Sequence, residues 1–311
     1  MNKDAKIYVA GHSGMVGSAV VRCLNKQGFN NIVLRTSKEL DLIRQVDTEK
    51  FFYKIKPEFV FLAAAKVGGI MANITYRAEF IYKNLQIQNN VIHSALRAGV
   101  KKLLFFSSSC VYPRRCPQPM KEKHLMTGSL EKTNEPYAMA KLSGMSMCQA
   151  YNEQYKTNFI SVIPTNLYGP NDNYDFEQSH LIAALIQKFH TAKVNNESEV
   201  FLWGTGSPRR EIMHVDDAAE ASVFLMENYD GTDPINIGLG TDLKIIEIAN
   251  IISSVIGYNG KICFDVKMPD GTPRKLLDVT KISDLGWESK ISMYEGIKNA
   301  YQWYLQYIAS F

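Results

Sequence analysis

Gly11-His12-Ser13-Gly14-Met15-Val16-Gly17 decides the fold, because this turn follows an apolar run at residues 6–10 and opens a helical pattern over residues 15–27. Glycine permits a tight turn and lets backbone amides approach a pyrophosphate closely. The N-terminus of the following helix then faces that negative charge. A strand, this turn and a helix in that order predict a dinucleotide-binding site at the start of the chain.

Strand and helix patterns alternate from this turn through the first half of the chain. We expect strands at residues 31–34, 59–63, 102–107 and 159–164, and helices at 46–55, 78–98 and 137–155. Continuously apolar strands suit a parallel sheet buried between helices. The pattern predicts the α/β class, with a Rossmann-like doubly wound parallel sheet and a smaller C-terminal α/β substrate domain. We assign residues 1–167 plus about 209–237 to the cofactor domain, and about 168–208 plus 238–311 to the substrate domain.

Composition excludes several classes of protein. The 311 residues carry a net charge of +4, and Lys and Arg are scattered rather than clustered, which argues against nucleic-acid binding. No apolar run is long enough to span a bilayer, so we expect no membrane partner. The five cysteines show no metal-ligand spacing, so we expect no metal site and a reducing, cytoplasmic location.

A second motif supplies acid–base chemistry. Tyr137 and Lys141 stand four positions apart, so they share one face of the expected helix. A nearby ammonium lowers the pKa of a tyrosine, which lets the phenol exchange a proton with a carbonyl or hydroxyl. Ser108 ends the strand expected at 102–107 and can donate to the same oxygen. These three residues form the set needed for hydride transfer at a carbon–oxygen centre.

The second expected strand bears on the choice of cofactor. It ends in Leu34-Arg35-Thr36-Ser37, without the acidic residue that would bind a free ribose 2′-hydroxyl. Arg35 and the hydroxyls favour a 2′-phosphate instead. We therefore expect NADP(H) rather than NAD(H).

With these motifs in place, the chain resembles the GDP-L-fucose synthase family of extended short-chain dehydrogenases/reductases nearly from end to end. The glycine turn has the spacing G-x-x-G-x-x-G, typical of extended members. The resemblance is carried further by the stretches at residues 62–70 (LAAAKVGGI), 108–113 (SSCVYP), 133–138 (TNEPYA), 164–170 (PTNLYGP), 214–217 (HVDD) and 269–275 (PDGTPRK). It implies NADPH-dependent reduction of the C4 ketone of a GDP-4-keto-6-deoxyhexose after epimerisation at C3 and C5. It also implies a homodimer with a helical interface.

The resemblance implies roles for individual residues. The catalytic Ser, Tyr and Lys fall on Ser108, Tyr137 and Lys141, and the epimerase acid–base pair falls on Cys110 and His180. The expected cofactor contacts are Gly11, Ser13, Gly14, Met15, Val16, Gly17, Arg35, Ser37, Asp41, Leu42, Ala64, Ser107, Lys141, Pro164, Asn166, Leu167 and His180. The expected substrate contacts are Ser108, Asn166, Lys188, Trp203, Arg210, Asp270 and Lys275, with Arg209 an alternative to Arg210 at the diphosphate.

Two departures from the family pattern affect ligand binding. Ser13 and Ser37 stand where the family carries Arg near the 2′-phosphate, so the preference for NADP(H) depends on Arg35. Lys188 replaces an Arg that touches the diphosphate, so a point charge takes the place of a bidentate fork. We expect Lys188 and the loop at residues 171–178 to influence the size of the sugar.

Three alternatives remain in view. A 4,6-dehydratase would carry two acidic residues where Ser109 and Cys110 stand, and a UDP-galactose 4-epimerase would lack the Cys110–His180 pair. A dedicated C4-reductase of a related GDP sugar, such as a heptose, could keep both residues as relics. A non-catalytic NADP(H)-binding regulator is the remote alternative, because such proteins usually lose the Tyr or the Lys.

Overall fold

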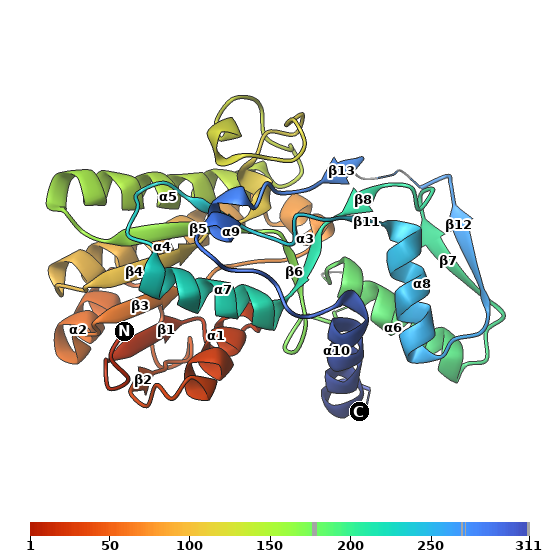
Figure 1. The fold of residues 1–311 in the computed structure, drawn as a ribbon, viewed down its shortest axis with the longest axis horizontal. Helices are drawn as coiled ribbons and strands as arrows, with labels where there is room; N and C mark the ends of the chain where they lie inside the picture. The colour runs from red at the N-terminus through yellow and green to blue at the C-terminus, as the bar shows by residue number, and fades with distance from the viewer. Residues whose placement is uncertain (176–178, 269, 271, 310–311) are drawn as a thin grey trace.

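Within residues 1–175, 179–268, 270 and 272–309, which the computed structural model describes, six strands form one parallel sheet (Figure 1). Their order is β10-β5-β4-β3-β1-β2, and every neighbouring pair is parallel. The strands are β1 (Ile7–Ala10), β2 (Ile32–Val33), β3 (Phe59–Leu62), β4 (Lys102–Phe106), β5 (Phe159–Pro164) and β10 (Ile235–Ile237). The predicted doubly wound parallel sheet is confirmed.

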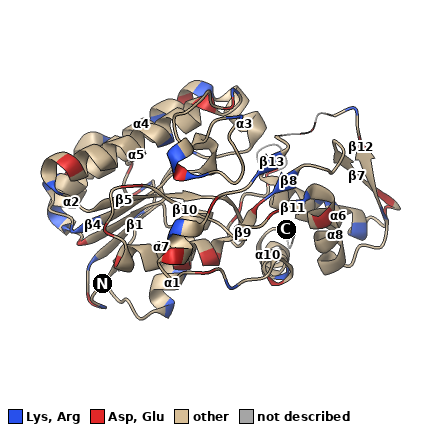
Figure 2. Cartoon of the chain, turned by 45° about the horizontal axis from the view of Figure 1, so that its top comes forward, with Lys and Arg blue, Asp and Glu red and all other residues tan. Residues whose placement is uncertain are grey.

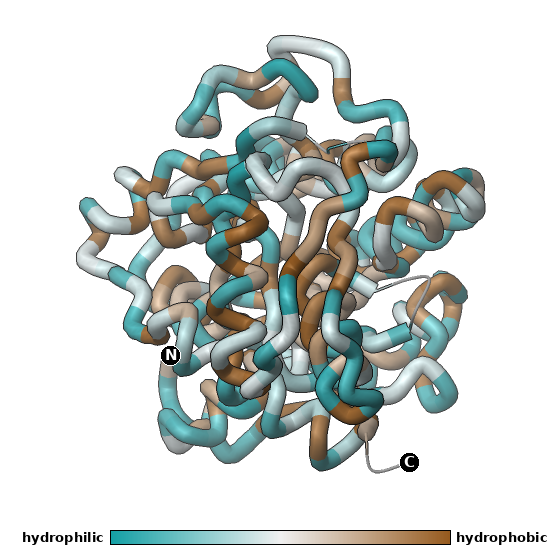
Figure 3. The backbone as a smooth tube through the Cα atoms, turned by 90° about the vertical axis from the view of Figure 1, so that its right-hand side faces the viewer, coloured by the Kyte–Doolittle hydropathy of each residue, from teal (hydrophilic) through white to brown (hydrophobic). Residues whose placement is uncertain are grey.

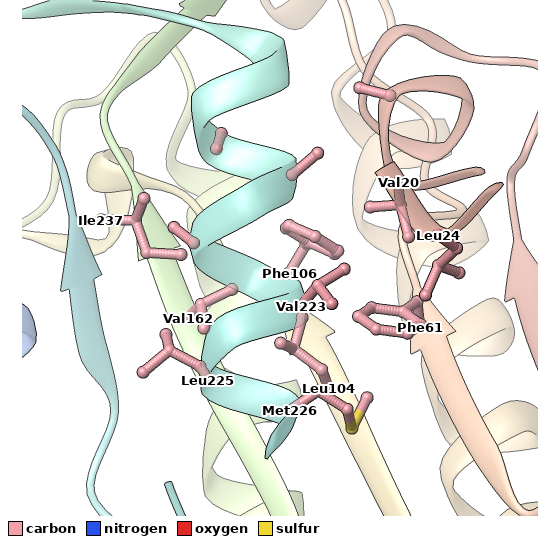
Figure 4. Packing of buried hydrophobic residues seen from close by; sticks show 14 of the residues in the cluster. Val20, Leu24, Phe61, Leu104, Phe106, Val162, Val223, Leu225, Met226 and Ile237 are labelled. Atoms are coloured by element: carbon pink, nitrogen blue, oxygen red, sulfur yellow. The ribbon is translucent and has the colours of Figure 1, made fainter. Parts of the chain in front are cut away.

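Helices cover both faces of this sheet. α1 (Met15–Lys26) and α7 (Val215–Asn228) pack on one face, whereas α2 (Gln45–Ile55), α4 (Arg77–Arg97) and α5 (Glu135–Tyr155) pack on the other. Successive residues of a strand point to opposite faces, so Leu104 and Phe106 join the core beneath α7 while Leu103 and Phe105 join the core beneath α4 and α5. Figure 4 shows Val223 and Leu225 of α7 against Phe106 and Val162 of the strands.

A separate apolar core lies at the other end of the molecule. It joins α6 (Leu181–Val194), α8 (Ile245–Ile256) and α10 (Met293–Tyr307) to the parallel pair β7 (Glu199–Trp203) and β12 (Lys261–Asp265). Figure 1 shows α6, α8, β7 and β12 on the right, apart from the six-stranded sheet. Ile186, Phe189, Ile252 and Ile297 are fully buried there, so this end packs around its own core.

Short strands lie between the two ends. β6 (Asn166–Tyr168) pairs with β9 (Ile212–His214), and β8 (Arg209–Arg210) lies between β11 (Leu243–Lys244) and β13 (Arg274–Lys275). The chain runs through this region each time it passes from one core to the other. Its segments bring together residues that are far apart in the sequence.

The expected elements of the first half match the observed ones to within two residues. α5 begins at Glu135, slightly ahead of the expected helix, because Pro136 fits the first turn of a helix. The short helices α3 (Ile70–Thr75) and α9 (Thr280–Asp284) and the 3-10 turns Ser109–Val111 and Glu122–His124 were not predicted. In Figure 3 apolar colouring runs through the strands at the centre of the molecule. Among the described residues, no helix is both long and apolar enough to cross a membrane.

Candidate active site

The candidate site lies where the parallel strands end. Gly11 follows β1, Ala64 follows β3, Ser107 follows β4 and Thr165 follows β5. The strands on either side of β1 connect through helices on opposite faces, which opens a crevice outside the carboxyl ends of the strands. The residues predicted from the glycine turn and from the Ser, Tyr and Lys set therefore share one edge of the sheet.

Two glycines of the turn, Gly11 and Gly17, have no room for a side chain. Gly11 has a φ of +83°, and a Cβ on it would lie 2.6 Å from the backbone nitrogen of Ala64. A Cβ on Gly17 would collide with the carbonyl oxygen of Gly11. Gly14 caps α1 without any side-chain hydrogen bond, which leaves the first amides of the helix available to an anion. This turn fits the pyrophosphate of a dinucleotide cofactor.

The segment after β2, where the ribose of the cofactor is expected, contains an acidic residue that was not predicted as part of the site. The carboxylate of Glu39 accepts hydrogen bonds from the backbone N–H and the hydroxyl of Thr36, both at 2.8 Å. These bonds, together with the charge of Arg35, lower the pKa of Glu39. Arg35 is exposed and donates to the carbonyl of Leu34 at 2.6 Å, while Ser37 is also exposed. Arg35 is thus exposed just after this strand, with the carboxylate of Glu39 nearby.

The other expected cofactor contacts are distributed around the same edge. Asp41 and Ser13 are exposed, Leu42 is buried with its carbonyl held by Asn90, and Ala64 lies against Gly11. Pro164 ends β5, whereas Asn166 and Leu167 belong to β6. Ser107 is buried, and its hydroxyl has no hydrogen-bond partner within the described part of the chain. Such an orphaned hydroxyl is compatible with a ligand atom as its partner.

The predicted catalytic residues converge at the end of β4. The hydroxyl of Ser108 accepts from the backbone N–H of Cys110 at 3.4 Å, and it also hydrogen-bonds to the side chains of Tyr137 and Cys110. The ammonium of Lys141 lies 5.8 Å from the centre of the Tyr137 ring and donates to the carbonyl of Phe106 at 2.8 Å. The structure therefore brings Ser108, Cys110, Tyr137 and Lys141 into one cluster.

The pKa of Tyr137 differs from the expectation. Burial raises it, with a further increase from the charge of Cys110, while the hydrogen bond from Ser108 lowers it. The predicted lowering by Lys141 was wrong for this structure, because the ammonium is bonded to a backbone carbonyl and is itself buried. Burial lowers the pKa of Lys141 to about 8. A raised pKa keeps the proton on the phenol, which is the form that can donate to a substrate oxygen.

Lys275, an expected substrate contact, lies beside Cys110. The two residues border a cavity of about 20 Å³, together with Ser109, Arg114 and Glu131. That volume accommodates about one water molecule. Burial raises the pKa of the Cys110 thiol, whereas the Ser108 hydrogen bond and the charges of Lys275 and Lys141 lower it. Burial outweighs these effects, so the pKa of Cys110 is raised overall and Lys275 offsets only part of that rise.

The two neighbouring arginines have different partners, which favours Arg210 over Arg209 as the expected diphosphate contact. Arg209 donates to the carboxylate of Asp242 at 2.5 Å, and Arg274 bonds to the same carboxylate. Arg210 donates to the carbonyls of Arg209 at 2.8 Å and Thr272 at 2.6 Å and pairs with no carboxylate among the described residues. Arg210 is therefore the residue whose charge remains available to a diphosphate. Figure 2 shows basic residues at β8 and β13, between the two cores.

Three other expected substrate contacts lie on or beside β7 and the turn that follows it. Trp203 ends β7, and 67% of its surface is exposed, so its ring is accessible to a ligand. Asp270 accepts from the backbone N–H of Thr205 at 2.8 Å and from its hydroxyl at 2.7 Å, and these bonds lower its pKa. Lys188 bonds to the carbonyl of Phe201, the strand residue two positions before Trp203. Pro269, Gly271 and residues 176–178 of the expected size-setting loop lie outside the described residues.

His180 lies apart from the Ser108 cluster. It caps α6, and its Nδ1 lies 3.6 Å from Oδ1 of Asp172. That hydrogen-bonding interaction raises the pKa of His180, although burial lowers it. In the part of the chain that the structure describes, no contact joins His180 to Cys110. Asp172 was missed by the sequence analysis, and the only signal for it was its place in the polar run after Gly169.

A second overlooked carboxylate supports the substrate-binding strands. Glu211 is fully buried and accepts backbone N–H bonds from Leu239 at 2.6 Å, Gly240 at 2.8 Å and Leu277 at 2.8 Å. Burial raises its pKa, and these three bonds lower it. Glu211 follows Arg210 and fixes the segment that carries Lys275, so it holds two cationic strands in register.

The fold and this edge cluster define an enzyme class. The family model described as "NAD dependent epimerase/dehydratase family" matches residues 7–238, from the first strand to the end of the parallel sheet. The chain therefore belongs to the NAD dependent epimerase/dehydratase family.

Relatives to which the chain is highly similar act, by their names, on GDP sugars. The chain is 56% identical over 309 residues to "GDP-L-fucose synthase 1" of Arabidopsis thaliana, covering 99% of this chain and 96% of the relative. A GDP-6-OMe-4-keto-L-xylo-heptose reductase from C. jejuni matches with a TM-score of 0.93 and 41% identity, over 98% of this chain and 99% of the other. A GDP-mannoheptose C4 reductase from Campylobacter jejuni with NADP bound matches with a TM-score of 0.90 and 42% identity, over 98% and 99%.

Proposed function

We propose that this protein epimerises a GDP-4-keto-6-deoxyhexose at C3 and C5 and reduces its C4 ketone with NADPH. The observation that carries the proposal is the cluster of Ser108, Cys110, Tyr137 and Lys141 at the edge that also holds the glycine turn. The similarity to a GDP-L-fucose synthase across the whole chain supports the substrate class.

NADPH, when bound, supplies the hydride that reduces the ketone. The residues of this chain orient the sugar and move its protons. Tyr137 donates its phenolic proton to the oxygen at C4, and the hydroxyl of Ser108, which reaches the phenol, holds that oxygen in place. Lys141 is fixed by the carbonyl of Phe106 below the phenol, where it can bind a ribose of the cofactor.

Epimerisation uses a different pair of groups. The ketone at C4 acidifies the protons at C3 and C5, and the thiolate of Cys110 removes a proton from one face. The imidazolium of His180 returns a proton to the opposite face, so each carbon is inverted with no net change in protons. Lys275 favours the thiolate, and Asp172 favours the imidazolium. Asp172 favours the form that His180 needs, whereas burial favours the thiol of Cys110, so the thiol must lose its proton before the exchange begins.

The substrate's nucleotide would extend from this cluster towards the second core. We assign the diphosphate to Arg210, with Lys188 and the ammonium of Lys275 within the same basic region. Trp203 offers its exposed ring to the guanine, and Asp270 is positioned by Thr205 to accept from the nucleotide. Asn166 donates to the carbonyl of Glu211 at 3.3 Å and lies where the cofactor and the sugar meet.

A dedicated C4-reductase acting on a GDP-heptose is the second candidate. It is favoured by the close fit to the two C. jejuni reductases. A purely regulatory role is disfavoured by the intact Tyr137 and Lys141. The deciding experiment incubates the protein with NADPH and GDP-4-keto-6-deoxymannose in D₂O. Deuterium at C3 and C5 of the reduced, galacto-configured product supports the epimerase, whereas reduction without deuterium supports the dedicated reductase.

We propose a homodimer formed through α4 and α5, because these helices expose Tyr82, Met139 and Tyr155 by 45–56%. We also retain the division into residues 1–167 plus about 209–237 and about 168–208 plus 238–311, which follows the separate cores. All five cysteines are free, which suits the cytoplasm. Sedimentation of the purified protein tests the dimer.

A further inference from the structure

We propose that Asp172 is a positioning residue that holds the imidazole of His180 by Nδ1, so that Nε2 is the atom that exchanges protons with the sugar. This role rests on the proposed epimerase function of His180. The contact itself is a feature of the described structure, with 3.6 Å between Oδ1 of Asp172 and Nδ1 of His180.

Asp172 is the fixed partner of the pair. Its side chain is 4% exposed, whereas that of His180 is 43% exposed. Oδ1 accepts from the backbone N–H of Asn173 at 2.8 Å. Oδ2 is buried and has no hydrogen-bond partner in the part of the chain that the structure describes. An unpaired buried carboxylate oxygen is costly, and an imidazole N–H is a donor that would satisfy it.

The distance between Asp172 and His180 can still shorten to that of a strong hydrogen bond. At 3.6 Å the pair is longer than a strong hydrogen bond but within an ion-pair contact. A small rotation of the exposed imidazole is enough to bring Nδ1 to the carboxylate. Catalytic hydrogen bonds are often long without substrate and shorten in the complex.

The loop that carries Asp172 is hydrogen-bonded to α1, the helix that follows the glycine turn. The side-chain amide of Asn171 donates to the hydroxyl of Ser18 in α1 at 2.8 Å, and Arg22 donates to the same hydroxyl at 3.2 Å. Arg22 also pairs with Asp216 at 2.5 Å. Asp172 is therefore held relative to the helix that starts at the glycine turn, and so relative to the bound cofactor.

The surroundings favour a charged imidazole. His180 caps α6, and a helix N-terminus disfavours a cation. Burial also disfavours the cation, but the interaction with Asp172 outweighs burial, and the net shift of the His180 pKa is upward. Among the described residues, the phenol of Tyr174 also lies near Asp172; it is buried, has a raised pKa and packs on Tyr304 of α10. Tyr174 stays neutral near pH 7, so the carboxylate is the charge that His180 meets.

The test compares Asp172→Asn with the wild-type protein by NMR. The chain has six His, so ¹⁵N-labelled imidazoles give a small set of signals, and His180→Gln identifies the one from His180. We expect Asp172→Asn to lower the His180 pKa and to slow solvent deuterium entry into the sugar by about 10–100-fold, the usual cost of losing an orienting partner. Asp172→Glu, which retains the charge, should restore part of both. NADPH affinity should not change.

An unchanged His180 pKa in Asp172→Asn would overturn the proposal, as would a lower pKa with an unchanged rate of deuterium entry. If the wild-type protein incorporates no deuterium but the pKa falls in the variant, the contact stands and the epimerase function fails. Should the variant not fold, the wild-type spectrum alone decides. Neutral His180 carrying its proton on Nδ1 supports the proposal, and the Nε2–H form contradicts it.

Discussion

Lys275 and Arg210 occupy facing positions in the parallel pair of β13 and β8, so two cations stand side by side on neighbouring strands. Lys275 also borders the cavity that contains Cys110. The charge of Arg210 and burial both lower the pKa of Lys275, whereas Cys110 raises it. An anionic substrate would relieve the repulsion between the two cations, of which Lys275 also acts on the thiol of Cys110.

Replacing Lys275 by Met should make Cys110 less reactive. Loss of the ammonium removes a charge that lowers the thiol's pKa, while the burial that raises it remains. We expect alkylation of Cys110 by iodoacetamide at pH 8 to slow by about tenfold, a typical effect of one nearby cation. Cys110→Ser identifies the reacting site. Equal alkylation rates in Lys275→Met and the wild type would show that the two groups do not interact.

Reduction and epimerisation should separate in Tyr137→Phe. In the proposed mechanism the phenol donates the proton to the oxygen at C4, so the variant should lose about 10²–10⁴-fold of its reductase rate. Deuterium exchange at C3 and C5 should continue, because Cys110 and His180 are intact. The experiment follows NADPH oxidation and deuterium content in the same sample. If exchange fell in parallel with reduction, the division of roles would be incorrect.

The reductase should have a pH limit set by Lys141. Burial lowers the pKa of this ammonium to about 8, so it is charged below that pH and loses its proton as the pH rises. If the charged form binds the cofactor, kcat/KM, which reports the free enzyme, should decline above pH 8. In Lys141→Arg the guanidinium stays charged, so the remaining activity should show no such decline. A decline retained in the variant would assign it to another group.

Arg209 and Arg210 should give opposite phenotypes. Arg209→Ala removes one of the two partners of the buried Asp242 and should lower stability by about 1–2 kcal/mol, a reduced figure because Arg209 is partly exposed. Arg210→Ala should leave the Tm nearly unchanged but raise the KM for the GDP sugar by about 10–100-fold, because a charge-assisted bond to phosphate is lost. Thermal unfolding and steady-state kinetics on both variants provide the comparison. A weaker Tm effect in Arg209→Ala than in Arg210→Ala would reverse the assignment.

The glycine turn offers a matched pair of substitutions. Gly17→Ala places a methyl group against the backbone of Gly11 and should destabilise the protein by about 1–3 kcal/mol, since backbone atoms cannot move aside easily. A Cβ on Gly14 meets only the Gly11 oxygen at 3.6 Å, an ordinary contact, so Gly14→Ala should fold normally. Thermal unfolding measures both. Equal stability of the two variants would contradict the close approach at Gly17.

The sequence was sufficient where local patterns decide the structure. The turn at Gly11–Gly17 was correctly predicted between β1 and α1, and Tyr137 and Lys141 were correctly predicted on one helix, because periodicity and backbone geometry are local properties. The contacts of Asp172, Asp242 and Lys275 depend on how separate segments pack in three dimensions. A single sequence does not show which segments pack together. The pKa of Tyr137 was mispredicted for a related reason, because the degree of burial depends on packing that residue spacing does not reveal.

The three backbone N–H groups that donate to Glu211 bear on how the protein should respond to high salt. The carboxylate of Glu211 accepts hydrogen bonds from backbone N–H groups inside the protein, where mobile ions do not reach. Arg210, in contrast, is proposed to bind the diphosphate by charge attraction, which dissolved ions screen. Raising the ionic strength should therefore weaken capture of the nucleotide while the junction around Glu211 keeps its geometry. Loss of activity in brine would then be reversed by dilution, without any refolding.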